Sequence, residues 1–371
     1  MNETDKVTMS QKSIHQLVHT LSYGDAISSE VLTFQRVFRE RGYESEIFAI
    51  HTHPKLSGVS RPFQEFPGEY DGEVILHYSL GSPLNEVYRS LNNAFRTIIY
   101  HNLTPPYWFE GINPRIVRDI RSGMKELPDL LQISNRILAD SSFNAQELKE
   151  FGVEAQVLPL SVDPERWTEE ANPGIRELLR STPGPHLLHV GRFAPNKCLQ
   201  DVVRSFYFFR HYLAPTSRLW LVGIEIDTEL YAFSIRHMVE QLGLRDAVEF
   251  PGCMADSELR ALYEESDLYL CMSEHEGFCL PVIEAMHFGL PVVAYSSSAL
   301  PETIQSGGIL VERKEPAHLA MLYHKILQSP ELREGLILGG KKRVSELSYA
   351  NFSRRVCELF NVEGSVHAYC A

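Results

Sequence analysis

Short apolar runs alternate with amphipathic segments twice along the chain, and this repeat restricts the fold more than any other feature of the sequence. An apolar run of about four to eight residues followed by an amphipathic segment is typical of a parallel β-sheet covered by helices. The pattern runs through the first half, breaks, and then starts again. The sequence therefore predicts an α/β fold with two Rossmann-like, doubly wound parallel sheets in series.

The first half contains the first set of alternating segments. Ser28 is expected to cap a helix that ends near Gly42, because serine accepts hydrogen bonds at a helix start and glycine adopts the conformation that ends one. A second helix is expected over residues 145–151, stopped by Gly152. The predicted strands cover residues 14–19, 46–50, 74–78, 97–101, 136–139 and 156–159.

Residues 164–185 are rich in proline and glycine, which is typical of a linker or a poorly packed inter-domain segment. The helical pattern of residues 317–360 has no strand left to cover, so a helix over 349–360 is expected to return to the first half. We therefore predict an N-terminal domain over residues 1–165, a C-terminal domain over residues 166–345 and a returning helical segment over residues 346–371. The predicted strands of the second half are 187–190, 219–222, 248–250, 268–272, 292–295 and 309–311.

Bulk properties limit the classes of function. A length of 371 residues suits two domains. The net charge of -13 argues against a mainly electrostatic nucleic-acid binder, because neutralising phosphates requires clustered lysine and arginine. No apolar run is long enough to cross a bilayer, and the polar N-terminus lacks a signal-peptide core, which predicts a cytoplasmic protein. The six cysteines are scattered and are expected to be reduced and mostly structural.

The segment EGFCLPVIE, from Glu276 to Glu284, follows an apolar run and opens a helix. Ligands of doubly wound folds bind beyond the carboxyl ends of the strands. A turn over residues 277–280 would present backbone N–H groups at a helix N-terminus, which favours an anion such as a diphosphate. Since carboxylates are poor phosphate ligands, Glu276 and Glu284 are better suited to sugar and ribose hydroxyls.

The segment HVGRFAPNK ends the first predicted strand of the second half. Gly191 allows a sharp turn, and Arg192 and Lys197 follow it at the same edge of the sheet. A guanidinium and an ammonium together hold a diphosphate and neutralise its charge as it leaves. The two motifs therefore predict one nucleotide-sugar site in the second half.

Four segments together resemble the retaining glycosyltransferases of family four, which have the GT-B fold: GRFAPNK, SEHEGFCLPVIEAMHFGLPVVA, ADSSFNAQEL and VLPLSVDPERW. The resemblance covers nearly the whole chain in the right order. It implies that Arg192 and Lys197 hold the donor phosphates, that Glu276 binds the sugar and that Glu284 binds the ribose. The remaining donor-binding residues that it implies are Gly24, Gly252, Cys253 and Met254 at the base-binding and phosphate loops, and Gly277, Phe278, Cys279 and Leu280 in the turn.

In the first half, His101 is the last residue of the predicted strand 97–101, a position where the family carries an active-site histidine that contacts the transferred sugar. The loop SYGDA retains only Gly24 of the family's glycine-rich turn, and Asp25 is an alternative ligand for an acceptor hydroxyl. Cys198 stands where the family commonly has glycine. Residues 160–163 read LSVD where the family commonly has NGVD.

The sequence predicts no metal site and no cofactor besides the donor substrate. The histidine pairs His51 with His53 and His186 with His189 lack further ligands at metal-binding spacing, and no Asp-x-Asp motif is present. Side-chain cations and a helix N-terminus are expected to replace a divalent ion.

The predicted activity is the retaining transfer of a hexose from a nucleoside diphosphate sugar to a hydroxyl of a glycan, a lipid-linked acceptor or a small molecule. The YHNLTPP and GDA segments resemble bacterial polysaccharide mannosyltransferases, so GDP-mannose is the first donor to consider, with UDP-sugars as the alternative. Peripheral contact with the inner face of the membrane fits such an acceptor. The alternatives are a sugar-nucleotide epimerase and a catalytically silent binding protein. A dinucleotide oxidoreductase is disfavoured because neither first strand precedes a GxGxxG motif.

Overall fold

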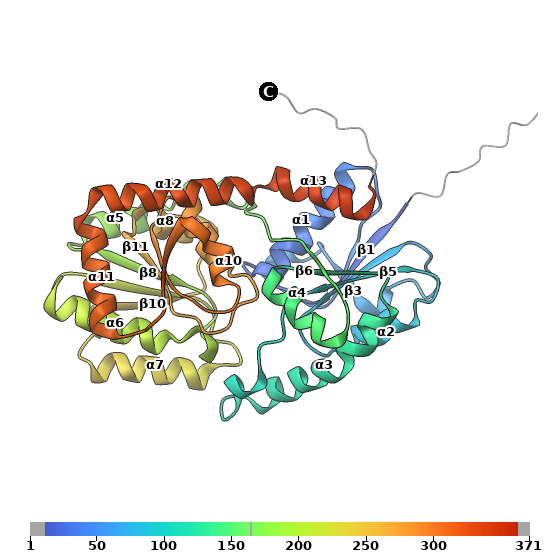
Figure 1. The fold of residues 1–371 in the computed structure, drawn as a ribbon, viewed down its shortest axis with the longest axis horizontal. Coiled ribbons are helices and arrows are strands. Elements are labelled where there is room, and N and C mark those ends of the chain that lie inside the picture. Colours follow the sequence, from blue (N-terminus) through green and yellow to red (C-terminus); the bar gives the residue numbers. More distant parts are fainter. Residues whose placement is uncertain (1–11, 164, 363–371) are drawn as a thin grey trace, which may run out of the picture.

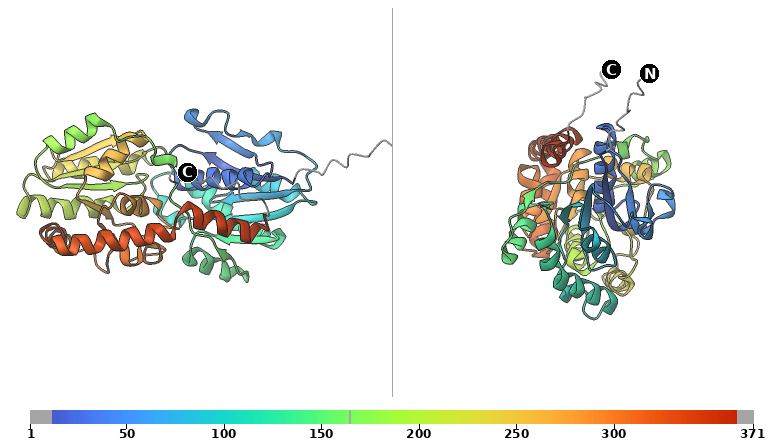
Figure 2. Two further views of the ribbon diagram at one scale, coloured as in Figure 1. Left: turned by 90° about the horizontal axis from the view of Figure 1, so that it is seen from above. Right: turned by 90° about the vertical axis from the view of Figure 1, so that its right-hand side faces the viewer.

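The computed structural model describes residues 12–163 and 165–362, which form two α/β domains (Figure 1). The N-terminal domain lies on the right of Figure 1 and the C-terminal domain on the left. The two domains lie side by side in the view from above (Figure 2). The predicted strands are found in both domains, because each apolar run forms a strand within one or two residues of its expected bounds.

A parallel seven-stranded sheet forms the centre of the N-terminal domain, in the order β3-β2-β1-β4-β5-β6-β7. The order reverses direction between β1 and β4, which creates a crevice at the carboxyl ends of these two strands. The interiors of β1 and β4 are almost fully buried because helices cover both faces of the sheet. The strands are β1 (Ile14–Leu21), β2 (Ile47–Thr52), β3 (Arg61–Pro62), β4 (Glu73–Tyr78), β5 (Phe95–Tyr100), β6 (Arg136–Ala139) and β7 (Gln156–Val157).

The first helix begins earlier than the sequence predicted. Helix α1 (Ala26–Glu40) is capped by Asp25, whose carboxylate accepts the backbone N–H groups of Ile27 at 2.9 Å and Ser28 at 3.3 Å. The prediction that Ser28 caps the helix is therefore wrong. Ser28 lies inside the first turn, and its hydroxyl oxygen accepts the backbone N–H of Ser22 at 2.7 Å. The same hydroxyl also contacts the Asp25 carboxylate, so the loop before α1 is fixed on both sides.

The other N-terminal helices are α2 (Leu84–Ser90), α3 (Pro114–Ile133) and α4 (Ser142–Leu148). Helix α4 starts three residues before the predicted position 145, because Ser141 caps it by accepting the N–H of Asn144 at 3.1 Å. A 3-10 turn, η4 (Lys149–Phe151), extends the helix to Gly152. Gly152 has a φ of 75°, and the predicted stop at this glycine is confirmed.

The C-terminal domain has a parallel six-stranded sheet in the order β10-β9-β8-β11-β12-β13. Here the order reverses between β8 and β11, so the loops after these two strands flank the second crevice. Both predicted donor motifs occupy those loops, since Gly191 follows β8 and Glu276 lies in the loop after β11. The strands are β8 (His186–Val190), β9 (Arg218–Val222), β10 (Val248–Gly252), β11 (Leu268–Cys271), β12 (Val292–Tyr295) and β13 (Gly308–Val311).

Residues 165–185 are better packed than a linker. Helix α5 (Pro173–Ser181) occupies this segment and packs against α8, and Trp167 and Leu179 are buried in a core of the C-terminal domain. The prediction of a poorly packed segment is wrong here because Asn172 caps a helix whose Pro173 is tolerated in the first turn. The other helices of this domain are α6 (Leu199–Tyr212), α7 (Glu229–Gln241), α8 (Asp256–Glu265), α9 (Leu280–His287), α10 (Leu300–Ile304), α11 (Pro316–Gln328) and α12 (Pro330–Glu346).

Helix α13 (Tyr349–Phe360) returns to the N-terminal domain, as the sequence predicted. It continues α12 along the top of Figure 1 and lies over the N-terminal domain. Its apolar side chains pack against α1, with the ring centroids of Phe352 and Phe34 at 5.2 Å and those of Phe360 and Phe38 at 5.2 Å. The last helix therefore ties the two domains together through a hydrophobic contact.

Within the described ranges, no helix is long and apolar enough to cross a membrane. The five cysteines in those ranges are free, which agrees with the prediction that they are reduced. Cys370, the proline at position 164 and the outer ends of the predicted first and third domains lie outside the described residues.

Candidate donor site between the two domains

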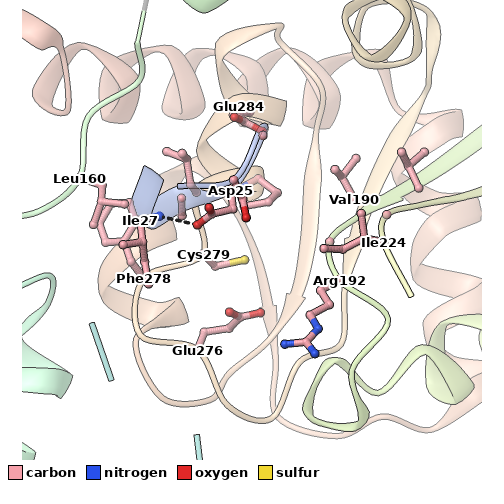
Figure 3. Close-up of a pocket in the computed structure, with 18 of the residues that line it drawn as sticks. Asp25, Ile27, Leu160, Val190, Arg192, Ile224, Glu276, Phe278, Cys279 and Glu284 are labelled. Atoms are coloured by element: carbon pink, nitrogen blue, oxygen red, sulfur yellow. Dashed lines mark hydrogen bonds between the residues drawn. The ribbon is translucent and has the colours of Figure 1, made fainter. Parts of the chain in front are cut away.

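A cavity of about 320 Å³ lies between the domains, where the two crevices face each other. Its C-terminal wall comes from the loops after β8, β9, β10 and β11 and from α9, and its N-terminal wall from the loops after β1, β5 and β6. In the close-up of Figure 3, Glu276 and Glu284 lie at opposite ends of the cavity and Arg192 lies on the side of Glu276. The predicted site residues that line it are Gly24, Asp25, His101, Arg192, Lys197, Cys253, Met254, Glu276, Gly277, Phe278, Cys279, Leu280 and Glu284.

Arg192 is held at the cavity by a close approach of two backbone segments. A Cβ atom on Gly223, which follows β9, would lie 1.8 Å from the carbonyl oxygen of Gly191, so only glycine fits there. The guanidinium Nη2 of Arg192 donates to the carbonyl oxygen of Ile226 at 3.0 Å. Its Nε is buried and has no hydrogen-bond partner in the described protein. Burial lowers the pKa of Arg192, and an anion in the cavity would compensate for this lost solvation.

Lys197 and Glu276 form an ion pair inside the cavity. The Nζ of Lys197 lies 2.7 Å from Oε1 and 2.8 Å from Oε2 of Glu276. Burial alone would raise the pKa of Glu276, but the Lys197 ammonium lowers it below its usual value. Burial likewise opposes the charge on Lys197, and Glu276 reverses this effect and raises the pKa of the lysine. The pair therefore remains ionised although both side chains are largely removed from water.

Cys198 follows this lysine and has the backbone conformation that a glycine would adopt at this position. Its backbone φ is 51°, in the left-handed region that glycine adopts most easily. Cys198 is the N-cap residue just before α6 and directly follows the 3-10 turn η6 (Pro195–Lys197), which carries the lysine. The residue departs from the family pattern, but the backbone that positions Lys197 has the conformation for which glycine is suited.

Glu284 has partners that the sequence did not reveal. The hydroxyl of Tyr263 donates to its Oε2 at 2.9 Å, and the guanidinium of Arg166 pairs with its Oε1. Arg166 also donates to Asp256 at 2.9 Å, and Tyr23 of the N-terminal domain donates to the same carboxylate at 2.7 Å. Arg166 and Tyr23 both line the cavity. This chain of contacts joins the α9 glutamate to the loop after β1 across the domain interface.

The turn before α9 touches the N-terminal domain directly. A Cβ on Gly277 would lie 3.0 Å from Asn102 Cβ, Asn144 Nδ2 and the carbonyl oxygen of His101, so a larger residue there would push the domains apart. The neighbouring His275 forms a hydrogen bond with Asn102. Burial lowers the pKa of His275 to about 4, so its ring is neutral. The Nδ2 of Asn102 donates to Glu147 at 2.8 Å and its Oδ1 faces His275, so the Nε2–H of His275 donates to this amide oxygen. The donor turn is therefore positioned by both domains.

The N-terminal wall contains Gly24, Asp25 and His101. Gly24 has a φ of 81°, which retains the glycine conformation at this point of the loop. The carboxylate of Asp25 is used to cap α1, so it already accepts the hydrogen bonds described above. His101 Nδ1 lies 2.9 Å from Asp140 Oδ2, and its Nε2 lies 2.9 Å from His77 Nδ1. Both ring nitrogens of the predicted catalytic histidine therefore have partners inside the protein.

Sequence reasoning placed most, but not all, of the residues around the cavity. Gly252 ends β10 with a φ of 74° and precedes the lining residues Cys253 and Met254 without lining the cavity itself. Arg166, Tyr23 and Asp140 line it and were not singled out. Two sequence features could have pointed to these residues: Arg166 lies in the segment VLPLSVDPERW, and Tyr23 lies in the loop SYGDA.

The two-domain fold matches that of solved structures. The structure superposes with a TM-score of 0.76 on sucrose-phosphate synthase from Thermosynechococcus elongatus, at 18% identity over 95% of this chain and 98% of that one. It superposes on Anabaena HepE in complex with UDP and glucose with a TM-score of 0.75, at 15% identity over 95% of this chain and 100% of that one. Two parallel-sheet domains facing a cleft are the GT-B fold of glycosyltransferases.

Residues 175–343 match the family described as Glycosyl transferases group 1. A GDP-mannose:cellobiosyl-diphosphopolyprenol alpha-mannosyltransferase of Xanthomonas oryzae is 31% identical over 36% of this chain and 35% of its own length. The MMP alpha-(1->4)-mannosyltransferase of Mycolicibacterium hassiacum is 33% identical over 37% of this chain and 35% of its own length. The matched segments thus span about a third of these relatives. A trehalose synthase of Pyrococcus horikoshii is 25% identical over 88% of this chain and 84% of its own length.

Proposed function

We propose that this protein is a retaining glycosyltransferase that moves a hexose from a nucleoside diphosphate sugar to an acceptor hydroxyl. One observation carries the proposal. Arg192 presents a buried, unpartnered Nε in a cavity that also holds Lys197 and the turn at the N-terminus of α9. A diphosphate would supply acceptors for these donors and would restore the solvation that the guanidinium has lost.

The arrangement of the other lining groups supports a nucleotide sugar as the whole ligand. Glu276 lies on the same side of the cavity as Arg192 and would accept hydrogen bonds from the transferred sugar, while Glu284 at the other end would hold the ribose (Figure 3). Cys253 and Met254 would contact the base. The N-terminal wall with Asp25 and His101 would face the acceptor. Because the carboxylate of Asp25 caps α1, this residue would contribute little to acceptor binding.

The proposed transfer reaction uses the positive charges of Arg192 and Lys197. The bond between the anomeric carbon and the diphosphate oxygen breaks as a bond to the acceptor oxygen forms on the same face of the sugar. The proton of the acceptor hydroxyl passes to the departing phosphate oxygen. Arg192 and Lys197 would stabilise the charge that grows on this leaving group, which is worth about 3 to 4 kcal/mol for a preorganised donor. These side chains would take the place of a divalent cation.

GDP-mannose is the proposed donor, because the two partial relatives described above are named mannosyltransferases and one of them names GDP-mannose. A glycan, a lipid-linked sugar or a small molecule is the proposed acceptor. Such an enzyme would work in the cytoplasm or at the inner face of the membrane.

A thermal-shift measurement with GDP, UDP and ADP tests donor binding. A nucleotide present at 100 times its dissociation constant is expected to stabilise the folded protein by about 2.7 kcal/mol, and GDP is expected to give the largest shift. Arg192→Met should reduce the shift strongly, because the free diphosphate already carries the charge that otherwise develops only as the bond to the sugar breaks. If none of the three nucleotides stabilises the wild-type protein, the proposed donor site is wrong. A larger shift with UDP would replace GDP-mannose by a UDP-sugar.

A further inference from the structure

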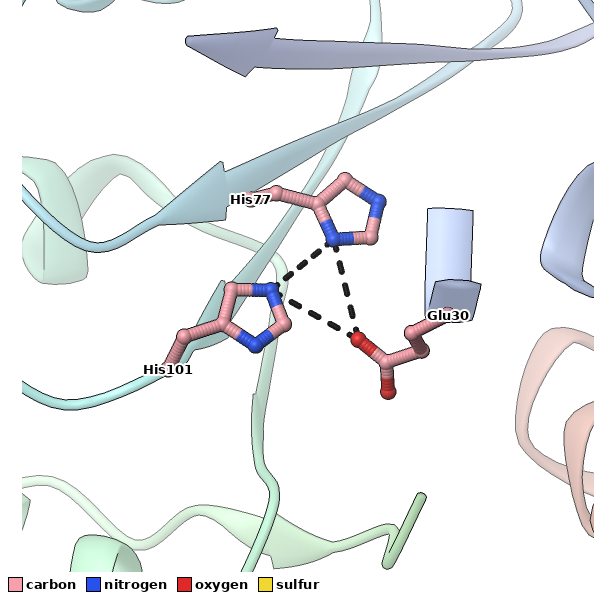
Figure 4. Close-up of side chains that lie close together, drawn as sticks. All are labelled: Glu30, His77 and His101. Carbon is pink, nitrogen blue, oxygen red and sulfur yellow. Dashed lines mark hydrogen bonds and ion pairs between the residues drawn. The ribbon is translucent and has the colours of Figure 1, made fainter. Parts of the chain in front are cut away.

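A buried polar cluster lies behind the N-terminal wall of the cavity. It consists of Gln16 on β1, Glu30 on α1, His77 on β4, and His101 and Asp140 in the loops after β5 and β6, and each is at most 8% exposed. Figure 4 shows the side chains of Glu30, His77 and His101 pointing toward one another. We call these five residues the histidine cluster. Only His101 and Asp140 reach the cavity.

The hydrogen bonds of the cluster determine where the protons lie. The amide Nε2 of Gln16 donates to the carbonyl oxygen of Val31 at 3.0 Å, so its Oε1 faces Nε2 of His77 at 2.9 Å. His77 Nε2 must therefore carry a hydrogen. Burial lowers the pKa of His77 well below its usual value, so this ring is neutral and its Nδ1 has a free lone pair.

The lone pair of His77 requires a donor on His101. His77 Nδ1 lies 2.9 Å from His101 Nε2, which must donate its hydrogen. The other nitrogen of His101, Nδ1, lies 2.9 Å from a carboxylate oxygen of Asp140 and donates there. A histidine that donates from both ring nitrogens is an imidazolium. The hydrogen-bond geometry around a neutral His77 thus indicates a positive charge on His101.

Three carboxyl groups surround that charge. Glu30 Oε2 lies 3.5 Å from His101 Nε2, and neither oxygen of Glu30 has a hydrogen-bond partner. Burial lowers the pKa of His101, but Asp140, then Glu30 and Asp25, outweigh it and raise this pKa to about 9. Burial and the neighbouring Asp140 raise the pKa of Glu30 to about 8. The cluster is therefore expected to lose its protons in coupled steps above pH 7.

The same atoms resemble a set of metal ligands, since Glu30, His77 and His101 converge. The separation of 2.9 Å between the two histidine nitrogens is a hydrogen-bond length. Two ligands of a tetrahedral zinc ion, each about 2.0 to 2.1 Å from the metal, would lie about 3.3 Å apart. The distance therefore favours a shared proton over a metal ion.

We propose that His101 stays protonated on both ring nitrogens throughout the reaction, as an imidazolium in the cavity wall. Glu30, His77 and Asp140 are then positioning residues that keep the second proton on its ring. This inference rests on the proposed transfer reaction. Because both ring nitrogens are already bonded within the protein, His101 would act through its charge and not by transferring a proton. It would complement Arg192 and Lys197 from the opposite wall as negative charge grows on the leaving diphosphate.

The pH dependence of turnover tests this role. The wild-type kcat is expected to fall on the alkaline side as His101 loses its proton, with an apparent pKa near 9. Removing an opposite charge lowers a cation's pKa, so Asp140→Asn should move this alkaline limb down by about one to three pH units. Glu30→Gln should move it down by about one unit. Glu40→Gln removes a charge from an exposed position of the same helix and should leave the limb unchanged.

A spectroscopic measurement separates this inference from the proposed function. In protein labelled with ¹⁵N-histidine, the His101 resonances, assigned by their loss in His101→Gln, should show two protonated ring nitrogens at pH 7.5. A neutral His101 ring at that pH, or one zinc ion per chain in metal analysis, would overturn the inference and leave nucleotide binding untouched. Failure of all nucleotides to bind would refute the proposed function, whereas the charge on His101 would still be measured.

Discussion

Arg192→Met is expected to lower kcat/KM for the nucleotide sugar by about 10²-fold to 10³-fold, which corresponds to the loss of one preorganised donor to a developing anion. The methionine side chain fills a similar space without a charge. The side chain is partly buried, its buried Nε has no hydrogen-bond partner among the described residues, and its hydrogen bond to Ile226 is directed at a backbone oxygen. Its removal should therefore cost little stability, and most of the effect should appear in kcat, because the phosphate charge grows as the bond breaks.

The matched control is Arg115→Ala. Arg115 pairs with Asp227 at 2.6 Å, but its side chain is 58% exposed and does not line the cavity. This variant removes the same formal charge, and it should keep kcat/KM within about twofold, since exposed ion pairs contribute little. Steady-state kinetics at constant ionic strength compare the two. Equal losses in both variants would mean that Arg192 acts only through the general potential of the protein, and the diphosphate assignment would then be wrong.

The strands could be predicted from sequence because parallel strands buried on both faces must be continuous apolar runs. The runs LLHV at 187–190 and VVAY at 292–295 have few other ways to satisfy their backbone groups inside a protein. Helix starts were less predictable. Asp25 and Ser28 both have side chains that cap helices, and the choice between them depends on the hydrogen bond from Ser22 to Ser28, which exists only in the folded loop.

Some residues of the candidate site could likewise be predicted from the sequence, and others could not. The site residues Arg192, Lys197 and Glu276 could be predicted from the sequence because each lies a few residues beyond a predicted strand. The order of strands in the sheet brings such loops together. The pairing of Glu284 with Arg166 could not be predicted, since Arg166 is 118 positions away and belongs to the segment between the sheets. The histidine cluster likewise draws Gln16, Glu30 and His77 from three elements whose local sequences carry no common signal.

Glu276→Gln is expected to reduce kcat by about 100-fold and to destabilise the protein by about 3 kcal/mol. The first effect follows from the loss of a charged acceptor for a sugar hydroxyl. The second follows because Lys197, whose side chain is only 20% exposed, loses its counter-charge, and breaking one side of a buried pair typically costs about 3 to 5 kcal/mol. The partial exposure of Lys197 places the expected value at the lower end. Urea unfolding and steady-state kinetics measure the two effects.

Lys197→Met should give a similar loss of stability with a distinctive pH dependence. In the wild-type protein the folded-state pKa of Glu276 is lowered, so the pair contributes stability above the unfolded pKa near 4.5, and this contribution is lost as the pH falls through the lower folded value. Without the lysine, burial raises the pKa of Glu276 above its unfolded value. The carboxyl group then destabilises the fold at neutral pH, and the variant should become more stable relative to wild type as the pH falls from 7 to 5.

The double variant Glu276→Gln/Lys197→Met separates folding from catalysis. Both charges are removed together, so neither is left buried and alone, and the free energy of unfolding should return to within about 1 kcal/mol of wild type. The kcat of the double variant should stay at that of the less active single variant, because the carboxylate that binds the sugar and the ammonium that binds the phosphate are both missing. Additive stability losses would show that the two side chains do not pair in the donor-free protein. Recovered turnover would show that neither residue takes part in the reaction, since a stable cavity without these charges would then be sufficient for transfer.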